Sequence, residues 1–229
     1  MLRVAEVFQS IQGEGLFAGT RSVFMRTTGC NLRCWFCDTP YTSWEPEGQQ
    51  RAWSDVLGEI LTLDCQHVVI TGGEPFLQPD IVPLSAELKR AGKIITVETA
   101  GTVFRPVTAD LRSVSPKLSN STPGVEHSAR WARRHAERRI NRTVLQQLTT
   151  EYRSQLKFVV DLPADVDEVE SFIDLPPSLP RDQVWLMPQA RTLDEVCAKA
   201  EWLEPLAQRK GFRYSSRLHI ELYGNVRGT

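Results

Sequence analysis

The sequence lacks the features that mark a membrane protein or a general binder of polyanions. It has no run of about 18 apolar residues, and its opening stretch, MLRVAEVFQSIQGEG, does not have the pattern of a signal peptide. Its formal net charge of −1 gives no overall attraction to nucleic acid or to an anionic membrane. We therefore expect a cytoplasmic protein with no membrane and no nucleic acid among its partners.

Cysteine is scarce and unevenly placed. There are five cysteines, an odd number, and three of them, Cys30, Cys34 and Cys37, fall within eight residues. This crowding suits metal ligation in a reducing compartment better than it suits a disulfide framework. Cys65 and Cys197 stand alone in apolar stretches, and we expect each to be a small buried core residue.

Short β-branched runs alternate with stretches of helical periodicity over most of the 229 residues. We predict strands at residues 21–27, 67–71, 93–99, 111–116, 155–161 and 183–188. We predict helices at residues 53–63, 80–91, 127–150, 165–174 and 192–209. Such alternation implies parallel strands joined by right-handed crossovers. The expected fold class is α/β, with residues 1–229 in a single domain. About six parallel strands with outer helices would form an open sheet or an incomplete, TIM-like barrel.

Unusual loops follow five of these strands at their carboxyl ends, where ligands gather in parallel α/β folds. In chain order they are the cysteine loop (residues 28–39), TGGEP (71–75), ETAGT (98–102), SPK (115–117) and MPQ (187–189). We expect a site assembled from these loops on one rim of the sheet. The segment LPPSLP (175–180) has the composition of a turn-rich connector.

The stretch RWARRHAERRINR, from Arg130 to Arg142, packs six arginines into thirteen residues. It could form an anion-binding face, but charge runs of this kind on a helix are more often a solvated surface. We favour the solvated surface.

The three clustered cysteines leave one corner of a metal site open. Structural zinc requires four protein ligands, and the next candidates after Cys37 are Cys65 and His67, at no zinc-like spacing. A cubane iron–sulfur cluster fits better, because three thiolates can hold three irons within one short loop. The fourth iron is then free to bind an exogenous ligand, such as the amine and carboxylate of an amino acid.

The spacing Cys30-x3-Cys34-x2-Cys37, with Phe36 before the last cysteine, resembles the signature of the radical S-adenosylmethionine superfamily. The resemblance implies a [4Fe–4S] cluster whose open iron binds the methionine part of the cofactor. It also implies that a 5′-deoxyadenosyl radical abstracts hydrogen from the substrate. The GGEP stretch resembles the family segment that receives the cofactor's amino group, which assigns Gly73 and Glu74 to the cofactor. Glu74 alone could equally be an acid at a helix N-terminus.

A narrower resemblance covers nearly the whole chain. Residues 7–39, SPK, QLKFVV (155–160) and the closing RLHIELYGNVRGT (217–229) are similar to the 7-carboxy-7-deazaguanine synthase family. The resemblance implies conversion of 6-carboxy-5,6,7,8-tetrahydropterin to 7-carboxy-7-deazaguanine with loss of ammonia, a carbon–nitrogen lyase reaction of queuosine and 7-deazapurine biosynthesis.

By the same resemblance, Ile11, Gln12 and Gly13 contact the pterin through backbone and amide groups, although Gln12 alone would be read as a surface glutamine. A guanidinium grips a carboxylate bidentately, so we assign Arg26 to the substrate carboxylate, with a salt bridge inside the fold as the alternative. Thr71 is a further expected contact.

The resemblance also implies Mg²⁺ held by Thr39, although Asp38-Thr39-Pro40 could be an ordinary turn. The residues it assigns to the cofactor are Phe36, Cys37, Asp38, Gly73, Glu74, Glu98, Ser115, Pro116, Lys117, Met187, Pro188, Gln189 and Ala190. Among them Glu98 would hold ribose hydroxyls. Some relatives end in a proline, whereas this chain ends in Arg227-Gly228-Thr229, so Arg217 and His219 are further candidates in the C-terminal segment.

Two other functions share part of this pattern. A radical activase that installs a glycyl radical on a partner protein would share the cysteines and GGEP, but it has no use for Arg26 and IQGEG. A zinc- or cluster-bearing RNA-binding module would use the arginine-rich helix, against the neutral overall charge. The family further suggests a homodimer and an electron donor such as flavodoxin.

Overall fold

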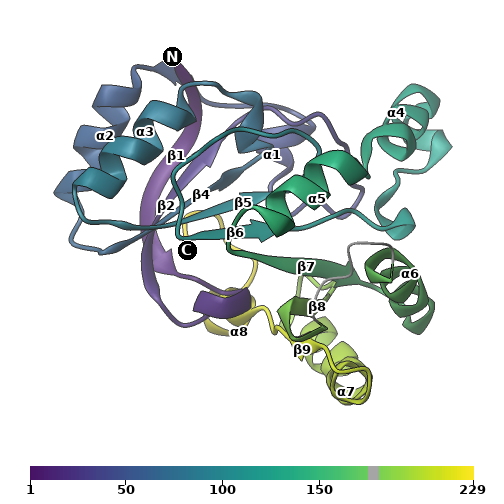
Figure 1. The fold of residues 1–229 in the computed structure, drawn as a ribbon. Coiled ribbons are helices and arrows are strands. Elements are labelled where there is room, and N and C mark those ends of the chain that lie inside the picture. The colour runs from purple at the N-terminus through teal and green to yellow at the C-terminus, as the bar shows by residue number, and fades with distance from the viewer. Residues whose placement is uncertain (175–180) are drawn as a thin grey trace.

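Among residues 1–174 and 181–229, which the computed structural model describes, nine strands form one sheet in the order β3-β1-β2-β4-β5-β6-β7-β8-β9 (Figure 1). They are β1 (Leu2–Ile11), β2 (Arg21–Thr27), β3 (Gln49–Arg51), β4 (His67–Gly72), β5 (Ile94–Thr99), β6 (Leu111–Val114), β7 (Ser154–Val160), β8 (Val184–Pro188) and β9 (Arg213–Tyr214). Neighbours from β2 to β9 are parallel, and β1 runs antiparallel to β2 and β3. The α/β open-barrel prediction is confirmed, and the predicted connector at 175–180 lies outside the described residues.

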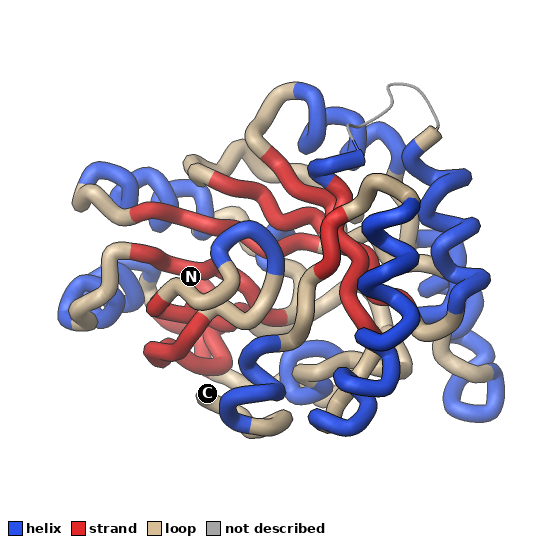
Figure 2. Tube along the Cα trace, turned by 90° about the horizontal axis from the view of Figure 1, so that it is seen from below, coloured by secondary structure: helices blue, strands red, loops and turns tan. Residues whose placement is uncertain are grey.

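Most of the helices lie along the outside of the curved sheet (Figure 2). They are α1 (Pro40–Ser43), α2 (Trp53–Thr62), α3 (Ile81–Arg90), α4 (Val125–Arg138), α5 (Arg142–Thr150), α6 (Pro163–Ile173), α7 (Leu193–Arg209) and α8 (Leu218–Tyr223). One predicted helix is wrong, because residues 127–150 form two helices. The Asn141 side chain accepts the N–H of Val144 at 3.3 Å and so caps a new helix, α5.

The two faces of the parallel strands differ because alternate residues point to opposite sides. Met25, Ile70 and Val97 on the outer face are fully buried in the core beneath the helices. Toward the carboxyl ends of the strands the intervening residues are mostly polar, and they include Arg26, Thr71, Glu98 and Lys157. The inner face of the sheet is therefore hydrophilic, unlike the filled core of a closed barrel.

The amino-terminal end of the inner face is closed by its own side chains. His67 lies between the hydroxyls of Ser22 and Thr96, at 2.8 Å from each. The ring of Phe17, from the 3₁₀ turn η1 (Gly15–Phe17), packs on His67 with 4.8 Å between centroids. Only the carboxyl rim of the inner face is left for chemistry.

Helix α4 holds the cysteine loop in place through His135, which is fully buried. The N–H of Arg33 donates to His135 Nδ1 at 3.1 Å, and His135 Nε2 faces the Ser121 hydroxyl at 2.9 Å. The Arg33 guanidinium lies 4.1 Å from the ring centroid of Trp131 on the same helix. The loop is thus bound to α4 by a buried side chain and by stacking.

The two isolated cysteines differ in their surroundings. Cys65 is buried, as expected, but Cys197 is exposed. The buried face of α7 is formed by Val196, Leu203 and Ala207, and Cys197 lies one position further around the helix. No helix in the described part of the chain is long and apolar enough to cross a membrane.

The buried His135 should make stability depend on pH. Burial, followed by the nearby charges of Lys117 and Arg139, lowers the pKa of His135 to about 4, from about 6.5 in an unfolded chain. A lowered histidine pKa means that stability present above pH 6.5 is lost as the pH falls toward 4. We expect wild-type protein to lose about 2 kcal/mol from this group between about pH 7 and pH 5.

Urea denaturation of His135→Gln and wild-type protein at the two pH values measures this effect. The buried His67 titrates in both proteins, so the difference between their pH slopes isolates His135. Equal slopes would contradict the assignment.

Candidate active site

The three cysteines of the cysteine loop are free thiols, each partly buried. Gly29, directly before Cys30, has a φ of +100°, a conformation that a larger residue would adopt only with strain. Burial raises the pKa of both Cys30 and Cys34 to about 12. Without a cation the two thiols therefore stay protonated, and bound iron would supply the positive charge that their thiolates need.

The donor set fits an iron–sulfur cube better than a single ion. In the described residues, no three His, Cys, Asp or Glu side chains are close enough to hold one metal ion. A structural zinc would need four such ligands around one centre. Thiolates that bind different irons of a cube lie further apart, so the loop is compatible with the cluster that its spacing predicts.

The TGGEP loop packs directly on the cysteine loop. The N–H of Glu74 donates to the carbonyl of Gly29 at 2.9 Å, and the N–H of Gly73 donates to that of Thr27 at 3.0 Å. A Cβ added to Gly73 would lie 2.2 Å from the Gly29 carbonyl oxygen. The glycine at this position is therefore required by the contact between two loops of the rim, whatever it contacts in a ligand.

The Glu74 carboxylate is fully buried and has protein partners on both oxygens. It accepts the Thr99 hydroxyl at 2.8 Å and the N–H groups of Ala100 and Phe76 at 2.9 and 3.1 Å. Burial raises the pKa of Glu74 above its ordinary value, and these donors oppose the rise. In the structure its side chain fixes the ends of β4 and β5 relative to each other.

The SPK segment continues the rim next to β5. The N–H of Ser115 donates to the Thr99 carbonyl at 2.7 Å, and Lys117 Nζ donates to the Ser115 hydroxyl at 2.8 Å. Lys117 is near enough to Cys34 to oppose the effect of burial on the pKa of that thiol. A cation thus lies beside the loop that would carry the cluster.

Arg217, one of the two open candidates in the C-terminal segment, joins three parts of the site. Its guanidinium grips both oxygens of Asp38 and donates to the carbonyl of Ala190, with Glu14 Oε1 at 3.5 Å. Its side chain is only 3% exposed. Arg217 therefore links the cysteine loop, the loop after β8 and the loop after β1.

A second buried cation extends these contacts across the inner face. Lys157 Nζ, on a side chain that is 5% exposed, pairs with Glu14 and lies 3.5 Å from Glu98 Oε1. Burial alone would raise the pKa of Glu14, but Lys157 and Arg217 hold it well below its usual value. The carboxylates of Glu14 and Glu98 in turn hold the pKa of Lys157 high. Glu14 and Lys157 therefore carry their charges at neutral pH.

Gln12, Thr71 and Glu98 meet on the inner face. Gln12 Nε2 donates to Glu98 Oε1 at 3.2 Å, and the Thr71 hydroxyl donates to Glu98 Oε2 at 2.8 Å. Gln12 is 4% exposed, so it is not a surface glutamine. Its backbone N–H and C=O already pair with Thr20 and Gly19, each at 2.8 Å. The amide side chain is the part of Gln12 that faces the other two residues.

The neighbours of Gln12 are held by the rest of the fold. Ile11 ends β1 opposite Arg21. The carbonyl of Gly13 accepts the N–H of Leu218 at 3.0 Å, and a Cβ at Gly13 would lie 2.1 Å from His219 Nδ1. The C-terminal segment therefore packs directly on this loop, and burial lowers the pKa of His219.

Arg26 lies in register with Thr71 on the adjacent strand, at the carboxyl end of β2. Its Nε is 3.1 Å from Glu6 Oε1, but the angle does not allow a hydrogen bond, so the contact is off-line. Its guanidinium is 5.1 Å from the Phe8 ring centroid. The salt bridge that was the alternative for Arg26 is thus present. Because the arginine is still 19% exposed and its Nε has no hydrogen bond, the pair leaves donors for another anion.

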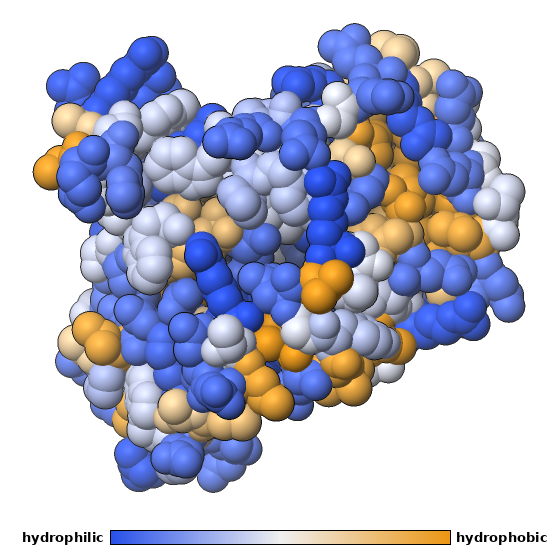
Figure 3. Space-filling model, turned by 180° about the vertical axis from the view of Figure 1, so that it is seen from behind, coloured by the Kyte–Doolittle hydropathy of each residue, from blue (hydrophilic) through white to orange (hydrophobic). Residues whose placement is uncertain are grey.

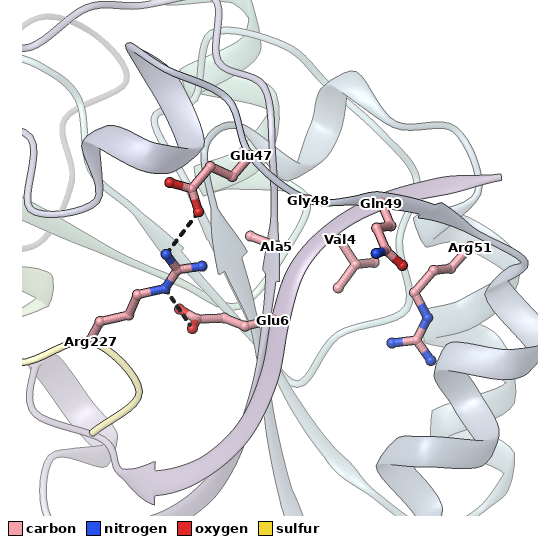
Figure 4. A pocket seen from close by; sticks show the side chains of 8 residues that line it. All are labelled: Val4, Ala5, Glu6, Glu47, Gly48, Gln49, Arg51 and Arg227. Atoms are coloured by element: carbon pink, nitrogen blue, oxygen red, sulfur yellow. Dashed lines mark hydrogen bonds and ion pairs between the residues drawn. The ribbon is translucent and has the colours of Figure 1, made fainter.

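Glu6 also forms part of a pocket of about 430 Å³ at the outer edge of β1 (Figure 4). Its carboxylate accepts the Tyr41 hydroxyl at 2.7 Å, and Arg227 bridges Glu6 and Glu47 at 3.2 and 2.9 Å. The pocket is lined by Val4, Ala5, Glu6, Glu47, Gly48, Gln49, Arg51 and Arg227. It lies apart from the three cysteines and touches the inner face only through Glu6.

The remaining predicted residues fall on the same rim. Thr39 directly precedes α1, and its hydroxyl is 3.0 Å from that of Thr42, with no cap hydrogen bond. Phe36, Pro116, Met187, Pro188 and Gln189 are buried around the loops after β2, β6 and β8. Sequence reasoning missed Glu14 and Lys157 as site residues. The available signal was a charge placed inside the apolar strand QLKFVV and inside the IQGEG stretch.

Comparisons of the sequence with known proteins point to one family. The family model described as the Radical SAM superfamily matches residues 24–144, just over half of the chain. The 7-carboxy-7-deazaguanine synthase of Rhodopirellula baltica is 45% identical over 229 residues, which cover 100% of this chain and 89% of that protein. The enzyme of the same name from Halobacterium salinarum is 44% identical over 235 residues, covering 98% and 91%.

A solved structure has the same architecture over nearly its whole length. The crystal structure of QueE from Escherichia coli superposes with a TM-score of 0.70 at 25% sequence identity, covering 95% of this chain and 94% of that one. Relatives this similar over the full length, with the cysteine loop and the rim in place, leave one assignment. The chain belongs to the 7-carboxy-7-deazaguanine synthase family of the radical SAM superfamily.

Proposed function

We propose that this protein converts 6-carboxy-5,6,7,8-tetrahydropterin to 7-carboxy-7-deazaguanine and ammonia at the carboxyl rim of its sheet. The observation that carries the proposal is the row formed by Arg26, Thr71 and Glu98 on adjacent strands, with Gln12 against it. This row offers a carboxylate partner and a hydrogen-bonding edge at the rim that also carries the three thiols. A planar substrate with both features fits it.

When bound, the [4Fe–4S] cluster and S-adenosylmethionine supply the radical that removes a hydrogen atom from the substrate. Cys30, Cys34 and Cys37 would hold the cluster. The backbone around Gly73, the SPK segment and residues 187–190 would bind the cofactor, and Lys117 is the cation nearest to the thiols among them. The chain's own contribution is to hold both ligands in one orientation and to exclude water.

Arg26 would bind the substrate carboxylate by exchange of its ion pair. Glu6 keeps the Tyr41 hydroxyl and Arg227 when Arg26 turns away, so its carboxylate does not lose all of its partners. The guanidinium gains a bidentate partner in place of the single off-line contact with Glu6. This exchange would fix the carboxylate end of the pterin above β2.

Glu98 is better placed for the substrate than for the ribose to which the family resemblance assigned it. Its two oxygens face Gln12 and Thr71, both expected to contact the pterin. A carboxylate can accept two parallel N–H groups, and the amino and ring N–H groups of a guanine-like edge provide such a pair. Gln12 and Thr71 would then form hydrogen bonds with the neighbouring acceptors and donors of the pterin.

Further expectations rest on the family resemblance and on composition. Mg²⁺ would join the substrate carboxylate to the Thr39 hydroxyl, with water as its other ligands. We also infer that the chain works as one domain, because all its described strands belong to one sheet. A cytoplasmic location, a homodimer and an electron donor such as flavodoxin complete this proposal.

Product analysis tests the reaction directly. Anaerobically reconstituted protein, dithionite and S-adenosylmethionine are incubated with the carboxytetrahydropterin, and the products are identified by mass. We expect the deazaguanine acid and ammonia in equal amounts, with little net loss of S-adenosylmethionine. Cofactor cleavage without this product, together with a glycyl radical on an added protein, would support an activase instead.

Arg26→Ala should reduce kcat/KM for the carboxypterin at least about 100-fold, because a charge-assisted bidentate contact is lost. Arg26→Lys should recover only part, since a point charge replaces the planar fork. Uncoupled cofactor cleavage should survive in both variants. Arg21→Ala is the matched control, because Arg21 is an exposed arginine at the other end of β2. Full carboxypterin turnover by Arg26→Ala would disprove the substrate assignment.

Arg217→Ala should destabilise the protein by about 2 kcal/mol, because Asp38 loses its partner and Glu14 keeps only Lys157. The affinity for S-adenosylmethionine should also fall, since the loops that hold Asp38 and Ala190 are no longer joined. Arg191→Ala removes an exposed arginine that contacts the same cysteine loop, and it should change stability by less than about 0.5 kcal/mol. Urea denaturation and cofactor titration measure both quantities, and equal effects of the two substitutions would contradict this role.

A further inference from the structure

The proposed reaction leaves one feature without a role, the arginine-rich surface of α4. The helix carries four arginines, Arg130, Arg133, Arg134 and Arg138. All but Arg134 are exposed, and only Glu126 and Glu137 oppose them on this helix. Since the whole chain has a net charge of −1, positive charge is concentrated here. The predicted solvated surface is thus also a local basic patch.

This patch is continuous with the cysteine loop. Arg33, from the loop, and Arg134, from the helix, both stack on Trp131, with 4.1 and 5.7 Å to its centroid. Trp35 lies between Cys34 and Cys37 and is 44% exposed, and its indole N–H donates to the Asn120 carbonyl. An aromatic side chain therefore reaches the surface from the same loop that Arg33 joins to α4.

We call this surface the basic face, and it comprises Arg33, Trp35, Arg130, Arg133, Arg134 and Arg138. Figure 1 shows α4 projecting at one end of the molecule, away from β1 and the helices α2 and α3. Figure 3, seen from behind, shows a mostly hydrophilic surface at the corresponding upper left corner. The projection is open to a partner of protein size.

We propose that the basic face is the docking surface of a small acidic protein that delivers a single electron to the cluster. The proposal rests on the proposed function only in requiring a cluster at the three cysteines. In the transfer the donor loses one electron and the cluster gains one. No atom or proton needs to cross the interface.

Three properties of the basic face favour this partner. Its charge is complementary to an acidic surface, which speeds encounter and orients the donor. Trp35 offers a rigid aromatic contact at the point nearest the thiols, and aromatic residues with arginine are enriched in such contacts. Its exposed contacts are charged rather than apolar, which suits a carrier that must dissociate after each transfer. A nucleic acid would need no contact with the thiol loop.

The test compares two charge-reversal pairs in the full-length, anaerobically reconstituted protein. The variant Arg130→Glu with Arg133→Glu changes the basic face. The matched control is Arg90→Glu with Arg209→Glu, which reverses two exposed arginines on α3 and α7. The probe is a purified acidic flavodoxin, and its dissociation constant is measured by calorimetry at about 50 mM and about 300 mM salt.

At the lower salt concentration we expect the basic-face variant to bind flavodoxin at least about tenfold more weakly than wild type, and the control pair to bind within about twofold. Raising the salt should weaken wild-type binding more than binding by the variant. Reduction of the cluster by flavodoxin, followed by absorbance, should slow in parallel, while reduction by dithionite should not change. Arg130→Gln with Arg133→Gln should give an intermediate loss, which separates the charge effect from any misfolding of the reversed variant.

Equal binding of flavodoxin by wild-type protein and both basic-face variants would overturn the proposal. It would also be overturned if the variants bound flavodoxin normally but lost affinity for a single-stranded RNA oligonucleotide, since the face would then be a nucleic-acid surface. Dithionite-driven product formation tests the catalytic function separately. If that function failed, the flavodoxin-binding result could still be interpreted.

Discussion

A line of alternating charges ties the thiol loop to the inner face of the sheet. It runs from Asp38 through Arg217, Glu14 and Lys157 to Glu98. Arg217 and Lys157 are almost fully buried, whereas Asp38 lies at the exposed end of the line. An isolated cation in such surroundings would be strongly unfavourable, and both are tolerated because their neighbours have the opposite sign. No single pair can therefore be considered alone, since removing a carboxylate leaves a buried cation with one partner fewer.

The line also explains how both ends of the chain enter one site. Glu14 comes from the loop after β1, and Arg217 directly precedes α8, so segments far apart in sequence meet at the rim. The parallel strands provide the scaffold, and their apolar outer residues keep the helices in place. Because the helices bury only that outer face, the inner face is free to carry charge. Ion pairs on this face then add to the backbone hydrogen bonds and the His135 contact that position the loops.

The sequence was sufficient for the scaffold and for the loops on its rim, because strands and their carboxyl ends are local signals. It was not sufficient for β1, whose run LRVAEVFQSI mixes partly buried polar residues with apolar ones. The split between α4 and α5 depends on the Asn141 cap, which a continuous helical period hides. The Lys157–Glu14 pair spans 143 residues, so a charge inside a strand could be noticed but its partner could not be named.

The arrangement around Glu6 explains how the guanidinium of Arg26 can be held on the inner face and still be available to a substrate carboxylate. A buried guanidinium needs an anion, yet an anion that held it by full bidentate contact would compete with a substrate carboxylate. Glu6 Oε1 gives Arg26 only an off-line contact and also accepts the Tyr41 hydroxyl, while Arg227 pairs with Oε2 (Figure 4). Burial raises the pKa of Tyr41 to about 12, so its hydroxyl remains a donor. Glu6 therefore stabilises the free site and can release Arg26 without becoming an unpaired charge itself.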